Sequence, residues 1–359
     1  MSAFPTHPDA ASAEWLTRQL RESGHLDDGE VSAVSWEPIG TGQVGDSVRF
    51  HLTYKERGDG PSTLAAKFSA ADRTSRGTAA MMGLYAKEVN FYRHGAAMID
   101  ARLPRILAAE VSEDGTEQML LFEDLGPARG GDQIAGCSPG DARAAIRQAA
   151  AIHAPSWKKQ DLLAADWLQP LPELASRIAA MYPQAQTTFR ERYGDILEPP
   201  YMTVCEELAA TPGFFDRADE QPQCLVHGDF RLDNMLFDIK GGSEPIAVLD
   251  WQTVTGGRAM TDIGYFMGCG IGADLRQVAE DELLDLYLAE MNARGVALER
   301  DDIWHDYRIG ALHGVSTAVF SAAFVERTDR GDANFLSMAR GACSLALEHD
   351  SIQALKENA

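Results

Sequence analysis

The sequence lacks long hydrophobic runs, paired cysteine motifs and an excess of basic residues. Its most apolar stretch, residues 310–325, is shorter than the roughly eighteen residues of a membrane span and contains polar side chains. Lysine and arginine number 32 against 54 acidic residues, for a net charge of −22, which argues against a nucleic-acid surface and against docking on anionic membranes. The five cysteines form no C-x-x-C pair, and the N-terminus has no signal-peptide pattern, so we expect a reducing, cytoplasmic location.

What is present indicates an ordinary globular protein with two lobes. The chain has 359 residues, of which 45% are apolar and 24% charged, so it can bury a large core. Period-two patterns dominate residues 1–126, whereas residues 127–359 are mostly helical apart from a strand-rich patch at 224–250. We therefore predict an α+β fold with a small antiparallel-sheet N-terminal lobe, 1–126, and a larger, mainly helical C-terminal lobe, 127–359. The Gly- and Pro-rich segment 125–140 marks the boundary.

Three glycines lie between two predicted strands of the first lobe. Gly40, Gly42 and Gly45 form the pattern G-x-G-x-x-G, which is weak evidence by itself. The segment after Gly45 alternates apolar and polar residues as a strand does, so the loop does not open a helix as a dinucleotide site would. Two interpretations remain open: a flap over nucleotide phosphates, or an ordinary hairpin.

A lysine and a glutamate are both expected to point inward. Lys67 ends the apolar run 64–68, where a buried ammonium needs a partner. The next predicted helix, about residues 78–98, has an apolar stripe that contains Glu88. The two charges would satisfy each other across adjacent elements, although a solvated Lys67 and a Glu88 at the edge of the stripe remain possible.

The strongest signal is a pair of apolar strands that each end in a carboxylate. Asp229 follows the first strand, Asn234 comes five residues later, and Asp250 ends the second. Strand ends project side chains into clefts, where a base and oxygen ligands for a metal are needed. One Asp as proton acceptor, with an Asn and a second Asp for Mg²⁺, is the minimal set for phosphoryl transfer.

With these residues identified, the sequence resembles the aminoglycoside phosphotransferase and choline kinase superfamily, which has the protein kinase-like two-lobe fold. Within it, the sequence is most similar to the ecdysteroid kinase-like branch of small-molecule kinases. The resemblance covers about residues 34–270 and rests on five segments: HGDFRLDN at 227–234, VLDWQ at 248–252, KEVNFYRHGA at 87–96, MLLFEDLG at 119–126, and DWQTVTGGRAMTDIGYFMG at 250–268.

The resemblance implies a role for each matching residue, with ATP and Mg²⁺ as cofactors. Asp229 would be the catalytic base, and Asn234 and Asp250 the Mg²⁺ ligands. The nucleotide would be bound by the glycines of the loop, by Lys67 oriented by Glu88, and by the hinge 122–125 with Glu123 and Leu125. His227 and Asp262 would brace the catalytic loop, residues 227–234, while Arg231 and Asp233 could touch phosphate or acceptor, or pair with each other.

The expected activity is therefore transfer of the γ-phosphate of ATP to a hydroxyl of a small molecule. Asp250-Trp251-Gln252 and His227-Gly228-Asp229 depart from the D-F-G and H-R-D of protein kinases, which by family analogy disfavours a protein substrate. A steroid-like or other apolar alcohol is the expected acceptor. An antibiotic phosphotransferase, a choline-type kinase and a non-catalytic nucleotide-binding pseudokinase are the alternatives, and the oligomeric state cannot be inferred.

Overall fold

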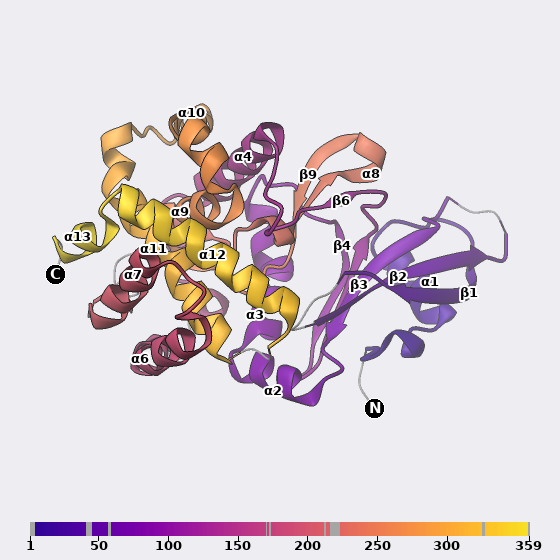
Figure 1. Ribbon diagram of the computed structural model, residues 1–359. Helices are drawn as coiled ribbons and strands as arrows, with labels where there is room; N and C mark the ends of the chain where they lie inside the picture. Colours follow the sequence, from indigo (N-terminus) through magenta and orange to yellow (C-terminus); the bar gives the residue numbers. More distant parts are fainter. Residues whose placement is uncertain are drawn as a thin grey trace.

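The computed structural model describes residues 4–40, 45–56, 59–169, 171, 174–211, 213–215, 223–324 and 327–357. Figure 1 shows a small lobe built on a twisted sheet at one end and a larger bundle of helices at the other. This arrangement confirms the predicted α+β class, with an antiparallel sheet in the first lobe and helices in the second.

The first lobe is organised around a five-stranded sheet in which every pair of neighbours is antiparallel. Its strand order is β1-β2-β3-β5-β4. The strands are β1 (Val31–Pro38), β2 (Gly45–Tyr54), β3 (Thr63–Ser69), β4 (Ile106–Val111) and β5 (Gln118–Glu123). Helix α1 (Ala13–Glu22) contributes Leu16 and Leu20 to the core on one face of the sheet, as its apolar stripe predicts. An apolar sheet face must be buried against another element, so this helix completes a small core.

The helical segment predicted at residues 78–98 is not one continuous helix. It consists of α2 (Arg73–Met81), α3 (Leu84–Asn90), a π turn (Phe91–Gly95) and a short 3₁₀ turn (Ala96–Met98). The break falls at Gly83, whose φ of +70° is accessible to glycine at little cost. The apolar periodicity continues across this break, which is why the sequence alone did not show it. The break allows α3 to pack against β4 and β5 independently of α2.

The second lobe is mainly helical. Its principal helices are α4 (Pro139–Ser156), α5 (Gln160–Leu163), α6 (Leu174–Tyr193), α7 (Pro199–Ala210), α9 (Met260–Tyr265), α10 (Ala273–Ala293), α11 (Arg300–Phe324), α12 (Asp329–Glu348) and α13 (Ser351–Lys356). Helix α4 begins with the predicted cap: Ser138 accepts the N–H of Asp141, and the Asp141 side chain accepts the N–H of Ser138. Helix α11 packs on both α9 and α12. No helix among the described residues is long and apolar enough to cross a membrane.

Two small sheets in the second lobe position the segments that contain Asp229, Asn234 and Asp250. Strand β7 (Cys224–Val226) pairs with β10 (Thr255–Gly257), while β8 (Met235–Asp238) lies between β6 (Arg129–Gly130) and β9 (Glu244–Val248). The turn from β8 to β9, labelled α8 (Ile239–Gly242) in Figure 1, has non-helical torsions at Lys240 and Gly241. Because β6 pairs with β8, the segment after residue 126 joins the second lobe, and we keep the division at 126 as a proposal.

Candidate active site

Lys67, Glu88 and Asp250 meet between the two lobes. The Nζ of Lys67 donates to both carboxylate oxygens of Glu88, at 3.0 and 2.8 Å, and to Oδ1 of Asp250 at 2.9 Å. Lys67 lies in β3 opposite Leu120 of β5, and Glu88 lies on the face of α3 that packs on the sheet. The inward ammonium and inward carboxylate predicted from the sequence are therefore partners, and a residue 183 positions away joins them.

The electrostatics of this group depend on burial. The side chain of Glu88 is 2% exposed and that of Lys67 13% exposed. Burial alone would lower the pKa of Lys67, but the charges of Asp250 and Glu88 outweigh it and raise that pKa. Burial raises the pKa of Glu88, and Lys67 opposes that effect. We take the pair to be ionised because one ammonium donates to both oxygens of the carboxylate.

Asp250 and Asn234 lie at neighbouring strand ends. The N–H of Leu249 donates to the carbonyl oxygen of Asn234 at 2.8 Å, which brings the end of β9 beside the end of the catalytic loop. Asp250 has φ of +62°, a conformation that non-glycine residues rarely adopt. The next residue, Trp251, is fully buried and stacks on Phe91 with ring centroids 4.0 Å apart. The backbone segments that carry these two oxygen-bearing side chains therefore lie next to each other.

Asp229 is the most heavily hydrogen-bonded side chain of the site. Tyr265 donates its hydroxyl to Oδ1 at 2.9 Å, and Asn234 donates Nδ2 to Oδ2 at 2.7 Å. The Nε of Arg231 donates to both oxygens, at 3.1 and 3.2 Å. Burial raises the pKa of Asp229, but the charges of Arg231 and His227 and the bonds from Tyr265 and Asn234 leave it lowered overall. The carboxylate is therefore ionised, as a proton acceptor must be.

A buried carboxylate holds the backbone of the catalytic loop. Asp262, at the start of α9, accepts the N–H of His227 at 2.7 Å and that of Gly228 at 2.9 Å. His153 of α4 lies 3.2 Å from the same carboxylate and 3.0 Å from the hydroxyl of Tyr287. Burial raises the pKa of Asp262, but the hydrogen bond and charge of His153, together with the charge and the backbone N–H of His227, leave it lowered overall. These contacts fit the bracing role that the family resemblance implied for His227 and Asp262.

Three contributors to the site were not identified from the sequence. Tyr265 lies on the buried face of α9, where a tyrosine is normally core. His313 of α11 lies 2.8 Å from the carbonyl oxygen of Gly228, and its ring meets that of Tyr265 edge-on. Gln133, from the Gly-rich boundary segment, accepts the N–H of Leu232 at 3.2 Å. Each of these three residues is more than 30 positions in the sequence from the loop residue that it contacts, and no local sequence pattern indicates that it belongs to the site.

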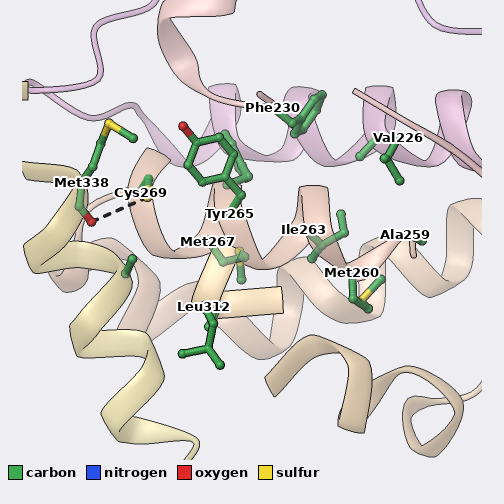
Figure 2. Close-up of a cluster of buried hydrophobic side chains, with 14 of the residues drawn as sticks. Val226, Phe230, Ala259, Met260, Ile263, Tyr265, Met267, Cys269, Leu312 and Met338 are labelled. Carbon is green, nitrogen blue, oxygen red and sulfur yellow. Dashed lines mark hydrogen bonds between the residues drawn. The ribbon is translucent and has the colours of Figure 1, made fainter. Parts of the chain in front are cut away.

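Figure 2 shows the hydrophobic packing around these polar groups. Phe230 and Tyr265 project into the same cluster, with Met338 and Cys269 on one side and Met260 on the other. The thiol of Cys269 contacts the carbonyl oxygen of Met338, which ties the segment after α9 to α12. The hydroxyl of Tyr265 is thus the polar end of an otherwise apolar, rigid side chain.

The predicted nucleotide-binding residues lie around β2, β3 and the end of β5. At Gly45, the first residue of β2, an added Cβ would lie 2.9 Å from the carbonyl oxygen of Phe68 and 3.1 Å from Cε of Lys67, so the start of this strand lies directly against the lysine. Gly40 has φ of +78°, and Gly42 lies outside the described residues. A side chain at Gly45 would displace the lysine, which explains the glycine there.

The acidic side chain of the predicted hinge is held by two cations. The carboxylate of Glu123 pairs with Arg102 and Lys240, both at 2.7 Å, which leaves it engaged in ion pairs. Burial raises the pKa of Glu123, but the two cations lower it to about 2. Leu125 is buried, and its carbonyl oxygen accepts the N–H of Lys240. If a base of a nucleotide binds here, the main chain between these residues would meet it.

The oxygen ligands present suit Mg²⁺ rather than a transition metal. The described part of the chain contains no group of three or more His, Cys, Asp and Glu side chains placed to hold a metal. Mg²⁺ takes one or two protein oxygens and completes its shell with phosphates and water. Asp250 offers a carboxylate on a side chain that is 30% exposed. Asn234 can offer its amide oxygen to the ion, because its amide nitrogen is the atom that donates to Asp229. These two residues fit the ion.

Comparison with known proteins gives the same outline. A family model described as the ecdysteroid kinase-like family matches residues 44–298. A Ralstonia eutropha protein with a provisional aminoglycoside phosphotransferase assignment superposes with a TM-score of 0.55, at 18% identity, over 93% of this chain and 97% of that one. The GDP and kanamycin complex of the phosphotransferase APH(2")-IIIa gives a TM-score of 0.52, at 12% identity, over 97% and 99%. At these identities the likeness concerns the fold.

A shorter likeness links the chain to curated animal proteins. The mouse protein named acyl-CoA dehydrogenase family member 11 is 48% identical over 46 residues, and the human protein of that name is 44% identical over 48 residues. The alignments span 13% of this chain and 6% of those proteins. The likeness is thus confined to a short segment.

Proposed function

The chain belongs to the ecdysteroid kinase-like family, and from this premise we propose that it transfers the γ-phosphate of ATP to a hydroxyl group of a small molecule. The family and the fold support a small-molecule phosphotransferase. The observation that carries the proposal is the convergence of Lys67, Glu88 and Asp250 at one point beside Asp229 and Asn234. Because the set is complete, a decayed, non-catalytic nucleotide-binding site is the weaker interpretation.

Each residue has a distinct part in the proposed reaction. Asp229 accepts the proton as the O–H bond of the acceptor breaks, and the acceptor oxygen forms a new bond to the γ-phosphorus. The bond from the γ-phosphorus to the bridging oxygen breaks, and its electron pair leaves with ADP. Lys67, held by Glu88, binds the phosphates, and Mg²⁺ on Asn234 and Asp250 would neutralise their charge. Positioning and electrostatics supply the rate enhancement, since no covalent enzyme intermediate is required.

The acceptor is proposed to be a steroid-like or other apolar alcohol. The family description supports this class. Kanamycin is the ligand of one structure with the same fold, so aminoglycosides belong in any screen, together with choline-type alcohols. A cytoplasmic location is part of the proposal, and it is supported by the five cysteines, all of which are free thiols.

The first test needs no acceptor. We expect ATP with Mg²⁺ to raise the melting temperature, because a ligand at a hundredfold excess over its Kd adds about 2.7 kcal/mol. For a chain of this size that corresponds to roughly 3–4 °C. Asp250→Asn should remove the part of the shift that depends on Mg²⁺. Asp238→Asn is the matched control. Like Asp250, Asp238 lies at the end of a strand and has a positive φ, but its carboxylate pairs with the exposed Arg129.

The outcomes separate the alternatives. A shift that Mg²⁺ does not change would favour a non-catalytic nucleotide-binding protein, and no shift with ATP or GTP would contradict the assignment of the site. After a positive result, a screen of alcohols for release of ADP would identify the acceptor. Asp229→Asn serves as its blank, because loss of the base should reduce turnover without abolishing nucleotide binding.

A further inference from the structure

Both oxygens of the Asp229 carboxylate accept hydrogen bonds from the protein itself. An ionised carboxylate has about four sites for hydrogen-bond donors. Here Oδ1 accepts from Tyr265, Oδ2 accepts from Asn234, and the single Nε–H of Arg231 lies between the two oxygens, at 2.7 to 3.2 Å. An acceptor hydroxyl that gives its proton to either oxygen therefore competes with one of these three donors.

Two of the three donors are fixed by their surroundings. Tyr265 is fully buried in the core of the second lobe, and its ring lies edge-on against His313. Asn234 is 6% exposed and donates to the backbone carbonyl oxygen of Asp229 as well as to its side chain. Moving either group would require repacking of the core or of the loop itself.

Arg231 is the donor that can move. Its side chain is 20% exposed, and its guanidinium reaches Asp229 through Nε and Asp233 through Nη1, the latter at 2.6 Å. Asp233 is held in turn, because its Oδ1 accepts the backbone N–H of Gln133 at 3.0 Å. The guanidinium can therefore turn away from Asp229 while it keeps a partner, which lowers the cost of its release.

We propose that Arg231 masks Asp229 until the terminal phosphate of a nucleoside triphosphate binds, and that the guanidinium then leaves Asp229 and contacts that phosphate. The proposal rests on the proposed function of the same site. Arginine suits this exchange because its planar, permanently charged fork binds carboxylates and phosphates with the same geometry. The consequence is an order of events, in which the nucleotide binds first and the base becomes available to the acceptor only afterwards.

The experiment compares two nucleotides that differ in the terminal phosphate. Titration calorimetry with Mg²⁺ measures the Kd of ADP and of the β,γ-imido analogue of ATP. In Arg231→Gln we expect the affinity for the analogue to fall at least tenfold, on the order of one charged hydrogen bond, with the affinity for ADP changed less than about twofold. Arg340→Gln is the matched control: Nε of Arg340 spans both oxygens of Glu198 at 3.0 and 2.9 Å, away from this site, and neither affinity should change.

A second variant tests the mask itself. Asp229→Asn removes the negative charge that binds the guanidinium of Arg231. The affinity for the imido analogue should therefore rise several-fold, and this gain should disappear when Arg231→Gln is also present. If the gain persists in the double variant, simple relief of charge repulsion explains it and the masking is wrong. If Arg231→Gln lowers the affinity for ADP and for the imido analogue equally, the proposal is also overturned. Failure of the unmodified protein to bind either nucleotide would instead refute the proposed function.

Discussion

Replacing Lys67 with methionine removes the ammonium that lies between Glu88 and Asp250. Methionine keeps the length of the side chain and most of its apolar contacts, so the main change is electrostatic. Glu88 is left in the core with a side chain 2% exposed, and Asp250 is left facing it at 30% exposure. The variant thus tests whether this buried group is ionised and how strongly it contributes to stability.

The magnitude follows from the burial of Glu88. Removal of one partner from a buried ion pair costs about 3–5 kcal/mol, because the remaining charge loses its compensation. Asp250 contributes less to the cost because water reaches it. For a chain of 359 residues this loss corresponds to a decrease of roughly 4–7 °C in melting temperature.

The loss should depend on pH, and its sign can be derived. Burial raises the pKa of Glu88, while the charge of Lys67 and its hydrogen bond lower it. Without Lys67 the folded-state pKa therefore lies further above the unfolded-state value. Such a group stabilises the fold fully below its unfolded pKa, and that contribution is lost as the pH rises through the folded pKa. The penalty of Lys67→Met should be small near about pH 5 and complete near about pH 8.

Differential scanning calorimetry of both proteins at the two pH values measures this difference. Lys240→Met is the control, because Lys240 also faces two carboxylates, Glu123 and Glu244, but is 38% exposed. An exposed pair contributes at most about 1 kcal/mol, so the control should lose little at either pH. A penalty for Lys67→Met that is the same at both pH values would refute the ionised, buried state of Glu88.

Two further predictions concern the support of the catalytic loop. Asp262→Asn replaces a charged acceptor that binds the N–H groups of His227 and Gly228, so we expect a loss of about 2–4 kcal/mol, measured by urea unfolding, and a cleavage site in the loop under limited proteolysis. Gly131→Ala should destabilise the fold by at least about 2 kcal/mol, because its Cβ would clash with the backbone carbonyl oxygen of Leu232 in this loop. Gly130→Ala has open space and should be neutral within about 0.5 kcal/mol; equal effects of the two substitutions would contradict the close approach.

The parts of the site that could be predicted from the sequence are those governed by local periodicity. The alternation in β3 and the apolar stripe of α3 decide which way Lys67 and Glu88 point, and a sheet-facing helix has few other places for such a carboxylate. The positions of Asp229 and Asp250 at strand ends likewise follow from short apolar runs. Even so, the single helix predicted at 78–98 was wrong, because a glycine at positive φ interrupts it without interrupting the pattern.

The parts that could not be predicted come from contacts across long sequence separations. Tyr265 reaches Asp229 over 36 residues, and His313 reaches Gly228 over 85. Within their own helices, Tyr265 lies at a buried position and His313 at a half-buried one, as ordinary core residues do. Only the packing of α9 and α11 near the loop makes their polar atoms part of the site. Such contacts depend on tertiary structure, so one sequence gives no signal for them.

The substitution of tryptophan for the phenylalanine of the protein-kinase D-F-G has a structural consequence. Trp251 fills the space between Phe91, at 4.0 Å between ring centroids, and His227, at 4.6 Å, and it is fully buried. A ring of this size, stacked on the segment that follows α3, cannot leave without opening a large cavity in the core. Asp250 is thereby held at its unusual positive φ, where Lys67 meets it. The strand end that carries Asp250 and the helix that carries Glu88 are therefore one packed unit, so this part of the site is assembled by the fold itself.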